Sequence, residues 1–451
     1  MNANIDKFGG DLFDQEKYLF ENDFIFLFLT FAKKSLMSEF IKNQERRIRD
    51  LYNFISGITT PKEKAADLYQ KYREVIASCH PYDAMVAIDL LMKENLELPV
   101  VKKGVNRSLN TLYKGIMTHP VPNYQKKPFF NYLNQENNEV LKLLSGLKPF
   151  IQKANEKNIS EKEFMDSLAK IETGISRLNE FNLHYIKLEN ILFPYIEKHV
   201  EESGCLPLMW SYHDDIRNLI KKTLQVLQEK PVDLKKLNRY IGDLYFVVYA
   251  MRFREEHILF PVVLDQIEEE EIEEMANQAY DVGFAFISPK RETHPAGKTN
   301  TSLTEKDENV LSLSDWEDKI LDFDTGKLTV KQAIIMLNSL PVDMTFVDEN
   351  DRVLYFSNPK DRIFQRSKAI IGRLVENCHP PSSVHIVKEL IEAFRSGKKS
   401  KESFWIQMGG KFILIQYFAM RDETGKYCGT LEVSQDVTDI KKLEGEKRLM
   451  D

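Results

Sequence analysis

The spacing of apolar residues divides the chain into a long helical part and a shorter part made of strands. From 38 to 280, apolar positions recur three and four residues apart, which is the period of an amphipathic helix. After 317 the period becomes two, in stretches such as VDMTFVDENDRVLYFSN and FWIQMGGKFILIQYFAM. One helical stretch, SSVHIVKELIEAFRSG, interrupts these strands. The pattern therefore predicts a multidomain chain, all-α first and then an α+β domain with an antiparallel sheet.

Breaks in the helical pattern indicate where the domains begin and end. Residues 38–118 are predicted to form a helical domain of unknown function, and the proline-rich segment 119–128 follows it. Residues 129–285 contain four long helical segments with short links between the last three, which predicts an antiparallel four-helix bundle. Residues 286–316 are polar and rich in Pro, Gly, Ser and Thr, so we expect a linker there. The alternating pattern assigns 317–442 to the last domain.

Residues 1–37 are predicted to be a separate N-terminal extension. Their apolar stretch FIFLFLTFA (24–32) is too short to span a membrane, which takes about twenty residues. The acidic flank before it is not typical of a signal peptide. Met37 opens an ordinary amphipathic helix, and we therefore expect residues 1–36 to be dispensable.

Composition and charge narrow the function further. The net charge of −7 and the lack of a long basic run argue against nucleic-acid binding, and no segment suggests a membrane partner. Four cysteines, none in a CxxC pair, are not a disulfide framework, so we expect a reducing cytoplasm. The sequence has no glycine-rich phosphate loop, no GxSxG motif and no kinase signature. No catalytic residue emerges from these motifs.

A repeated motif carries the candidate chemistry. The chain has ILFP twice, in HYIKLENILFPYIEKH (184–199) and MRFREEHILFPVVLD (251–265), each time after a cluster of acids and histidines. We expect each copy to end a helix at its proline. In an antiparallel bundle, the second and fourth helices can bring such clusters to related depths. A shared cation would offset the cost of burying them, and imidazole with carboxylate suits iron, manganese or zinc.

Together with its flanking segments, this motif resembles a hemerythrin-like (HHE cation-binding) domain. The order HPVP…EN, KLENILFPYIEKH, MWSYHDDIR, EEHILFP and GRLVENCHPPSSVHIV…GTLEVSQDVTDI is similar to a bacterial family. That family combines domain of unknown function 438, a hemerythrin-like bundle and a C-terminal PAS domain, and the resemblance covers about residues 45–449. It implies metal ligands on the bundle helices: His184, Glu189, His213 and Glu256 by direct match, with Glu255, His257 and Glu136 as substitutes.

The match to the family's usual ligands is partial. The resemblance implies a di-iron site with five histidines and two bridging carboxylates. Here Met251 stands where the repeat predicts histidine, and Met209 and Arg217 stand four residues on either side of His213. A carboxylate-rich site or a single-metal site is therefore the alternative to a di-iron centre.

Helix geometry limits the site as well. In an ideal α-helix, the five-residue step from His184 to Glu189 corresponds to a separation of about 140° around the axis. The two side chains can therefore face one atom only in a wide or bridged site, and the resemblance implies that Glu189 and Glu256 are the bridges. The simpler alternatives are a hydrogen-bonded pair on a wet helix surface for His184 and a pair with Asp214 or Tyr212 at a helix surface for His213.

The PAS-like domain offers a second set of candidates. Cys378 and His379, with His385 on the following helix, could hold haem iron or another metal. A tight turn with Ser382 or Ser383 near the helix cap is the alternative. An apolar pocket for a ligand such as haem or flavin could also be filled by the domain's own core. The lining that we expect is Phe346, Leu354, Phe356, Ile363 and Phe364.

These observations predict a cytoplasmic metal-binding sensor or regulatory protein. Its bundle would bind non-haem iron, either as a di-iron or as a single-metal site, respond to O2, NO or redox state, and act on the PAS domain. Since only a short segment follows the last strand, we expect output through a protein partner or through self-association, such as a homodimer of PAS domains. The alternatives are an iron-donating protein that repairs iron–sulfur centres, as the resemblance implies, and a metal-free interaction scaffold.

Overall fold

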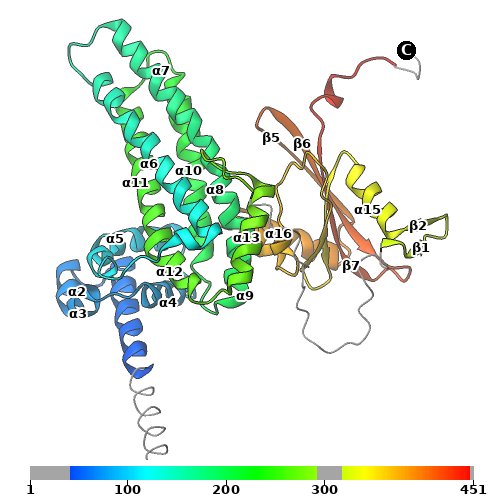
Figure 1. Ribbon diagram of the computed structural model, residues 1–451, viewed down its shortest axis with the longest axis horizontal. Coiled ribbons are helices and arrows are strands. Elements are labelled where there is room, and N and C mark those ends of the chain that lie inside the picture. Colours follow the sequence, from blue (N-terminus) through cyan, green and yellow to red (C-terminus); the bar gives the residue numbers. More distant parts are fainter. Residues whose placement is uncertain (1–40, 292–316, 447–451) are drawn as a thin grey trace, which may run out of the picture. The chain divides into compact units, whose positions relative to one another are not determined.

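The computed structural model describes residues 41–291 and 317–446, which Figure 1 draws in colour. These residues divide into two compact units. One contains the described residues up to Val121 together with His257–Leu259, and the other contains the remainder. The predicted N-terminal extension and most of the predicted linker lie outside the described residues. A helical region followed by an antiparallel sheet confirms the fold class expected from the sequence.

The N-terminal unit is built from short helices with buried apolar faces. Leu51, Phe54 and Ile55, at helical spacing, are almost completely buried. Gly115 permits close helix packing, because a Cβ atom there would lie 2.1 Å from the Ile76 carbonyl oxygen. The elements are a helix at 41–59, α2 (Ala65–Lys71), α3 (Arg73–Ala77), α4 (Pro81–Met92) and α5 (Leu98–Ile116).

A four-helix bundle follows, as the sequence predicts. Its long helices are α6 (Pro128–Ala154), α7 (Glu161–Arg177), α10 (Leu206–Leu227) and α11 (Leu234–Arg254). Helix α6 packs against α7 and α11, and α10 packs against α11 and α7, so the four close around one core (Figure 1). Helix α7 begins with a capping box formed by Ser160 and Glu163, which confirms the start expected from the sequence.

Short elements complete the bundle. The second predicted helix is interrupted rather than continuous, because a 3-10 turn and a π-helical turn divide it. The fourth is interrupted in the same way near its end. The short elements are η1 (Tyr124–Lys126), η2 (Leu178–Phe181), α8 (Asn182–Lys187), η3 (Leu188–Leu192), α9 (Phe193–His199), η4 (Glu255–Leu259), α12 (Phe260–Leu264) and α13 (Glu269–Val282).

The C-terminal domain contains a five-stranded antiparallel sheet in the order β4-β3-β7-β6-β5. Gly409 and Gly410, both with positive φ, form the predicted turn between β5 and β6. The strands are β1 (Ile320–Asp322), β2 (Lys327–Thr329), β3 (Asp343–Asp348), β4 (Val353–Phe356), β5 (Lys401–Met408), β6 (Lys411–Arg421) and β7 (Tyr427–Asp436). The helices are α15 (Val330–Ser339), η5 (Lys368–Ile370), η6 (Val375–Cys378), α16 (Pro381–Arg395) and η7 (Ile440–Lys442).

The core of this domain includes a cluster formed by Val347, Val353, Ile370 and Cys378. Phe356, which the sequence suggests as pocket lining, packs against that cluster. Leu354 was expected beside it, but its side chain is half exposed, since neighbouring residues of a strand point to opposite faces of the sheet. Phe346, Ile363 and Phe364 are half-buried.

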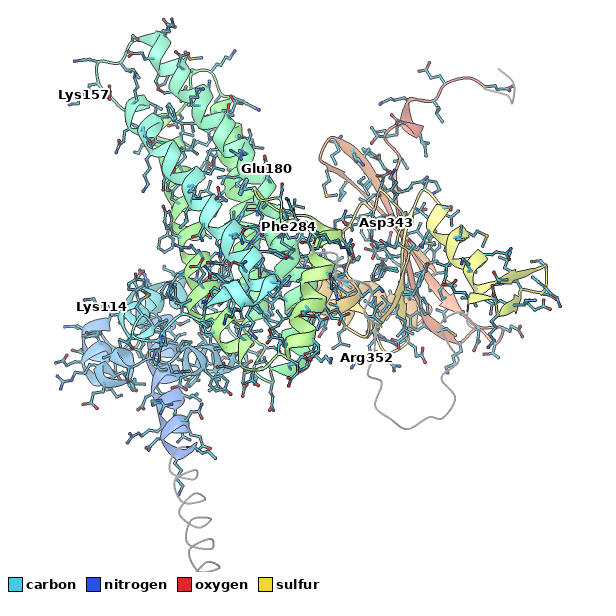
Figure 2. All side chains as sticks on the ribbon, viewed as in Figure 1. Lys114, Lys157, Glu180, Phe284, Asp343 and Arg352 are labelled. Carbon is cyan, nitrogen blue, oxygen red and sulfur yellow. The ribbon has the colours of Figure 1, made fainter. Side chains whose placement is uncertain are left out.

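Asp343, labelled in Figure 2, fixes the loop that follows β4. Its carboxylate accepts hydrogen bonds from the backbone N–H groups of Ile363 and Phe364 at 2.8 and 3.0 Å. Within the described ranges, the search for a helix able to cross a membrane finds no candidate.

Candidate cation site in the helical bundle

The two copies of the repeated motif share one local structure, a π-helical turn in front of the proline. In η3 the Phe193 N–H donates to the carbonyl of Leu188, five residues back, and η4 has the same bond at the same place in its motif. Pro194 and Pro261 follow, and neither has an N–H to continue the usual ladder. The expectation that each copy ends a helix at its proline is wrong, because α9 and α12 continue beyond it.

His184 and Glu189 stand at the start of the first motif copy, before the π turn is closed. The Leu188 N–H still bonds the His184 carbonyl as in an α-helix, so the ideal separation of about 140° between the two side chains holds approximately. Both side chains are buried, with 0% of His184 and 3% of Glu189 exposed. They therefore point to different partners in the interior and not to one atom.

His184 lies between two carboxylates from other helices. Its Nδ1 is 2.9 Å from Glu136 Oε2 on α6, and its Nε2 is 3.1 Å from Glu255 Oε2 at the start of η4. Asn137 donates to the same Glu255 oxygen at 2.8 Å. Burial opposes a charge on this imidazole, but the two carboxylates outweigh it and raise the pKa of His184 to about 9.

A buried lysine occupies the other side of Glu136. The Lys187 ammonium is fully buried, lies 2.9 Å from Glu136 Oε1, and donates to the Gly283 carbonyl at 2.7 Å. It also lies over the ring of Phe284, labelled in Figure 2. The Ala285 N–H donates to Glu136 Oε1 at 2.7 Å. Both oxygens of Glu136 are therefore engaged by groups of the protein.

Glu189 is engaged in the same way. His213 Nδ1 lies 2.7 Å from Glu189 Oε1, and Arg217 donates to both carboxylate oxygens at 2.9 and 3.0 Å. Arg217 also bonds Asp214 and Asn182, which fixes its guanidinium. Burial is the main reason that the pKa of His213 is lowered, so its imidazole is neutral. A neutral ring with its proton on Nδ1, donated to Glu189, carries its lone pair on Nε2.

Among the buried polar atoms of the described residues that have no hydrogen-bond partner are His213 Nε2, Glu255 Oε1 and the Tyr185 hydroxyl. They come from α10, η4 and α8. The Tyr185 ring stacks on His213, with centroids 4.3 Å apart and planes at 20°. Glu255 contacts His184, the neighbour of Tyr185 in the chain. The charge of Glu255 acts on both other groups, and it adds to burial in raising the pKa of Tyr185.

Two further predicted ligands, Glu256 and His257, do not belong with His213, Glu255 and Tyr185. Glu256 is paired with Arg252 Nε at 2.9 Å, and burial raises the pKa of its carboxyl. His257 is grouped with the N-terminal unit and is half-buried. Met251, where the repeat predicts histidine, is buried. Within 41–291 and 317–446, no three or more His, Cys, Asp or Glu side chains are grouped as a metal site.

This arrangement fits a single cation better than a di-iron centre. A metal-binding imidazole commonly donates its other N–H to a carboxylate, and Glu189 holds His213 in that way. Glu255 and Tyr185 would supply two oxygen donors to such a cation. A second metal would need Glu136 or Glu189, whose oxygens already bind cationic side chains.

The candidates in the PAS domain are not brought together. Cys378 packs in the core, and burial raises the pKa of its thiol. His379 is half-buried and donates from Nδ1 to the Val375 carbonyl at 2.8 Å, whereas His385 is exposed. Pro380 is the cap residue of α16, and Ser382 and Ser383 lie near it in the first turn, where the Ser383 hydroxyl donates to the Pro380 carbonyl at 3.1 Å.

Three residues of the site were not predicted: Tyr185, Lys187 and Arg217. A signal exists for the two cations. Lys187 is the one basic residue between His184 and the ILFP of its motif, and Arg217 lies one helical turn after His213. For Tyr185 the sequence offers no signal, because a tyrosine beside a histidine is an ordinary core residue.

Comparison with known proteins identifies two regions. Residues 129–263 match the hemerythrin HHE cation binding domain, and residues 334–438 match a PAS domain. Both confirm the resemblance found in the sequence, while domain of unknown function 438 at 38–118 stays a prediction. No curated protein matches the chain.

Solved structures with similarity to the chain cover about a quarter of it. A C-terminal domain from Streptococcus mutans is 35% identical, over 28% of this chain and 99% of that chain, with a TM-score of 0.28. A PAS domain from Colwellia psychrerythraea is 18% identical, over 24% and 98%, with a TM-score of 0.19. The sensor region of a sensor histidine kinase is 17% identical, over 22% and 40%, with a TM-score of 0.17.

Proposed function

We propose that this chain, which joins a hemerythrin HHE cation-binding domain to a PAS domain, is a regulatory or sensor protein whose bundle binds one metal cation. The observation that carries the proposal is the set of three unpartnered polar atoms of His213, Glu255 and Tyr185. Each such atom lowers the free energy of unfolding by about 1–3 kcal/mol when it stays buried without a partner. A cation bound by all three would remove that cost.

Iron is the cation that we propose. The donors are one imidazole nitrogen and two oxygens, which suit iron, manganese or zinc, and the domain class adds weight to iron. Bound iron would supply a redox-active centre able to interact with O2 or NO.

The chain's own residues have separate tasks at this site. Glu189 keeps the lone pair of His213 on Nε2, while Asn137 and His184 hold the other oxygen of Glu255. Lys187 and Arg217 neutralise Glu136 and Glu189, so the region does not need a second metal.

Metal analysis and absorption of the full chain test the proposal. After anaerobic reconstitution with Fe2+, we expect about one iron per chain, and less than about a tenth would refute iron binding. Exposure to air should then produce a visible phenolate-to-iron band that Tyr185→Phe removes. Tyr195→Phe is the matched control, since Tyr195 is a buried tyrosine whose hydroxyl bonds Gln278.

A second candidate function is a metal-free regulatory bundle. Lys187 and Arg217 favour it, because they already supply positive charge to two of the buried carboxylates. In that case the reconstituted protein would have no iron and no visible band. His213→Ala would then change stability alone.

A further inference from the structure

The π turn η3 leaves two backbone carbonyls without a helical partner. In an α-helix the Phe193 N–H would bond the Glu189 carbonyl, but here it bonds Leu188. The next donor in the ladder would be Pro194, which has no N–H for the Asn190 carbonyl. Buried carbonyls need partners, since each unpaired one costs about 1–3 kcal/mol.

The PAS domain supplies both partners. Arg373 Nη1 donates to the Glu189 carbonyl at 2.9 Å, and the Ser367 hydroxyl donates to the Asn190 carbonyl at 2.5 Å. The Asn190 side chain returns a bond to the Gln365 carbonyl at 3.2 Å. Arg373 and Ser367 are 6% and 3% exposed, so these bonds form in a largely dry contact.

The same arginine also holds the helix beyond the proline. Its Nε and Nη2 lie 2.8 and 2.6 Å from the two oxygens of Glu197 on α9. The arginine is itself fixed to the sheet, because its carbonyl accepts from the Val353 N–H and the preceding Gly372 donates to the Val353 carbonyl. One guanidinium therefore connects η3, α9 and strand β4.

The second copy of the motif shows that the position needs a cap. The Glu256 carbonyl occupies the same place in η4 as that of Glu189 in η3. It accepts a hydrogen bond from the Tyr124 hydroxyl at 2.8 Å, within the helical region. The first copy is thus the one whose cap comes from the PAS domain.

We infer that Arg373 and Ser367 are positioning residues for the candidate cation site. By capping the two carbonyls they hold η3 in its π-helical form, and this form directs the Glu189 carboxylate to His213. Loss of the extra residue from the turn would rotate Glu189 by about 100° relative to the helix beyond it. The Nε2 lone pair of His213 would then lose its orientation. The importance of this coupling for sensing rests on the proposed function.

The coupling is reciprocal. If docking of segment 365–373 strengthens cation binding by some factor, cation binding strengthens that docking by the same factor. The bundle can thereby act on the PAS domain through hydrogen bonds that are already present.

Hydrogen exchange of the metal-free full chain tests the inference directly. In Arg373→Ala we expect amides at 188–196 to exchange at least about ten times faster, while the core strands of the PAS domain keep their protection. Arg373→Lys should give an intermediate rate, because a compact ammonium lacks the planar fork that pairs with both Glu197 oxygens while it reaches the Glu189 carbonyl. Arg395→Ala is the control, since Arg395 pairs with Asp351 inside the PAS domain, and it should leave 188–196 unchanged.

Wild-type rates at 188–196 in folded Arg373→Ala would overturn the inference. Should that variant fail to fold, Ser367→Ala removes a single hydroxyl, and we expect about threefold faster exchange; unchanged rates there would overturn the inference equally.

Titration with Co2+ separates this inference from the proposed function. If the wild type binds Co2+, Arg373→Ala should weaken binding about tenfold and shift the absorption of the bound ion, and unchanged binding would contradict the positioning role. If the wild type binds no metal while exchange at 188–196 still rises, the proposed function fails and the structural coupling stands.

Discussion

Replacing Lys187 by methionine tests whether the bundle supplies its own positive charge. Lys187 is fully buried, and methionine keeps much of its aliphatic length while removing the ammonium. The change removes one of the two cationic partners of buried Glu136, because His184 stays 2.9 Å from its other oxygen. The carbonyls of Gly283 and Leu183 lose a donor at the same time. Breaking a buried ion pair by removing one partner costs about 3–5 kcal/mol, and we expect a loss in that range.

Urea unfolding measures this loss as a lower midpoint with an unchanged slope. Hydrogen exchange in α6 and α10 then shows that the bundle is the region destabilised. Lys198→Met is the matched control. Its ammonium pairs with Glu271 at the surface and its side chain is 66% exposed, so we expect a change below about 1 kcal/mol.

A double variant makes the reasoning refutable. Lys187→Met with Glu136→Gln removes both charges, so we expect it to be less destabilised than the sum of the single variants by at least about 1 kcal/mol. Additive losses, or a loss below about 1 kcal/mol for Lys187→Met alone, would refute an ion pair as the reason for this buried lysine.

Three further predictions follow from the same structure. The pKa of His184 rises from 6.5 to about 9 on folding, so protonated His184 stabilises the fold by roughly 3 kcal/mol. This stabilisation is complete below about pH 6.5 and is lost as the pH rises through 9. Urea midpoints measured from pH 6 to 10 should therefore decline in the wild type and stay level in His184→Gln. Tyr124→Phe removes the hydroxyl that caps the Glu256 carbonyl and should cost about 1–3 kcal/mol, read from the urea midpoint. Cys378, buried with a raised pKa, should react with a thiol reagent only after urea unfolds the PAS domain, and rapid labelling of the native chain would contradict its place in the core.

The order of a helical part and an antiparallel sheet follows from the sequence, because the period of the apolar residues differs between helices and strands. Helical spacing before 280 and alternation after 317 predict the bundle and the sheet. Ser160 and Glu163 predict the start of α7, since a capping box is a local signal. Leu354 shows the limit: alternation gives the two faces of a strand, and only the packed structure decides which one is buried.

The candidate site follows from the sequence only in part. The repeated motif predicts that His184 and Glu189 are buried polar residues of the bundle, the segment MWSYHDDIR predicts the same of His213, and all three are buried. It does not predict that Glu255, rather than Glu256, contacts His184. Adjacent positions of a helix lie about 100° apart around its axis, and only the packing of the bundle decides which of the two carboxylates faces His184.

The sequence also does not predict which cations pair with the buried carboxylates. Lys187 and Arg217 lie near the predicted ligands in the chain, but a lysine or arginine on a helix usually faces water. Only the packing of α6 and α10 shows that both cations point inward at carboxylates.

The two caps on the repeated motif also differ in when they can form. Tyr124 precedes Glu256 in the chain, so η4 has its hydroxyl partner as soon as it is synthesised. The Glu189 carbonyl waits for Arg373, 184 residues later. At about 5–20 residues per second, a ribosome needs roughly 10–40 s to reach that arginine. During this interval the Glu189 and Asn190 carbonyls lack their caps, and η3 gains these hydrogen bonds only after the PAS domain has been synthesised.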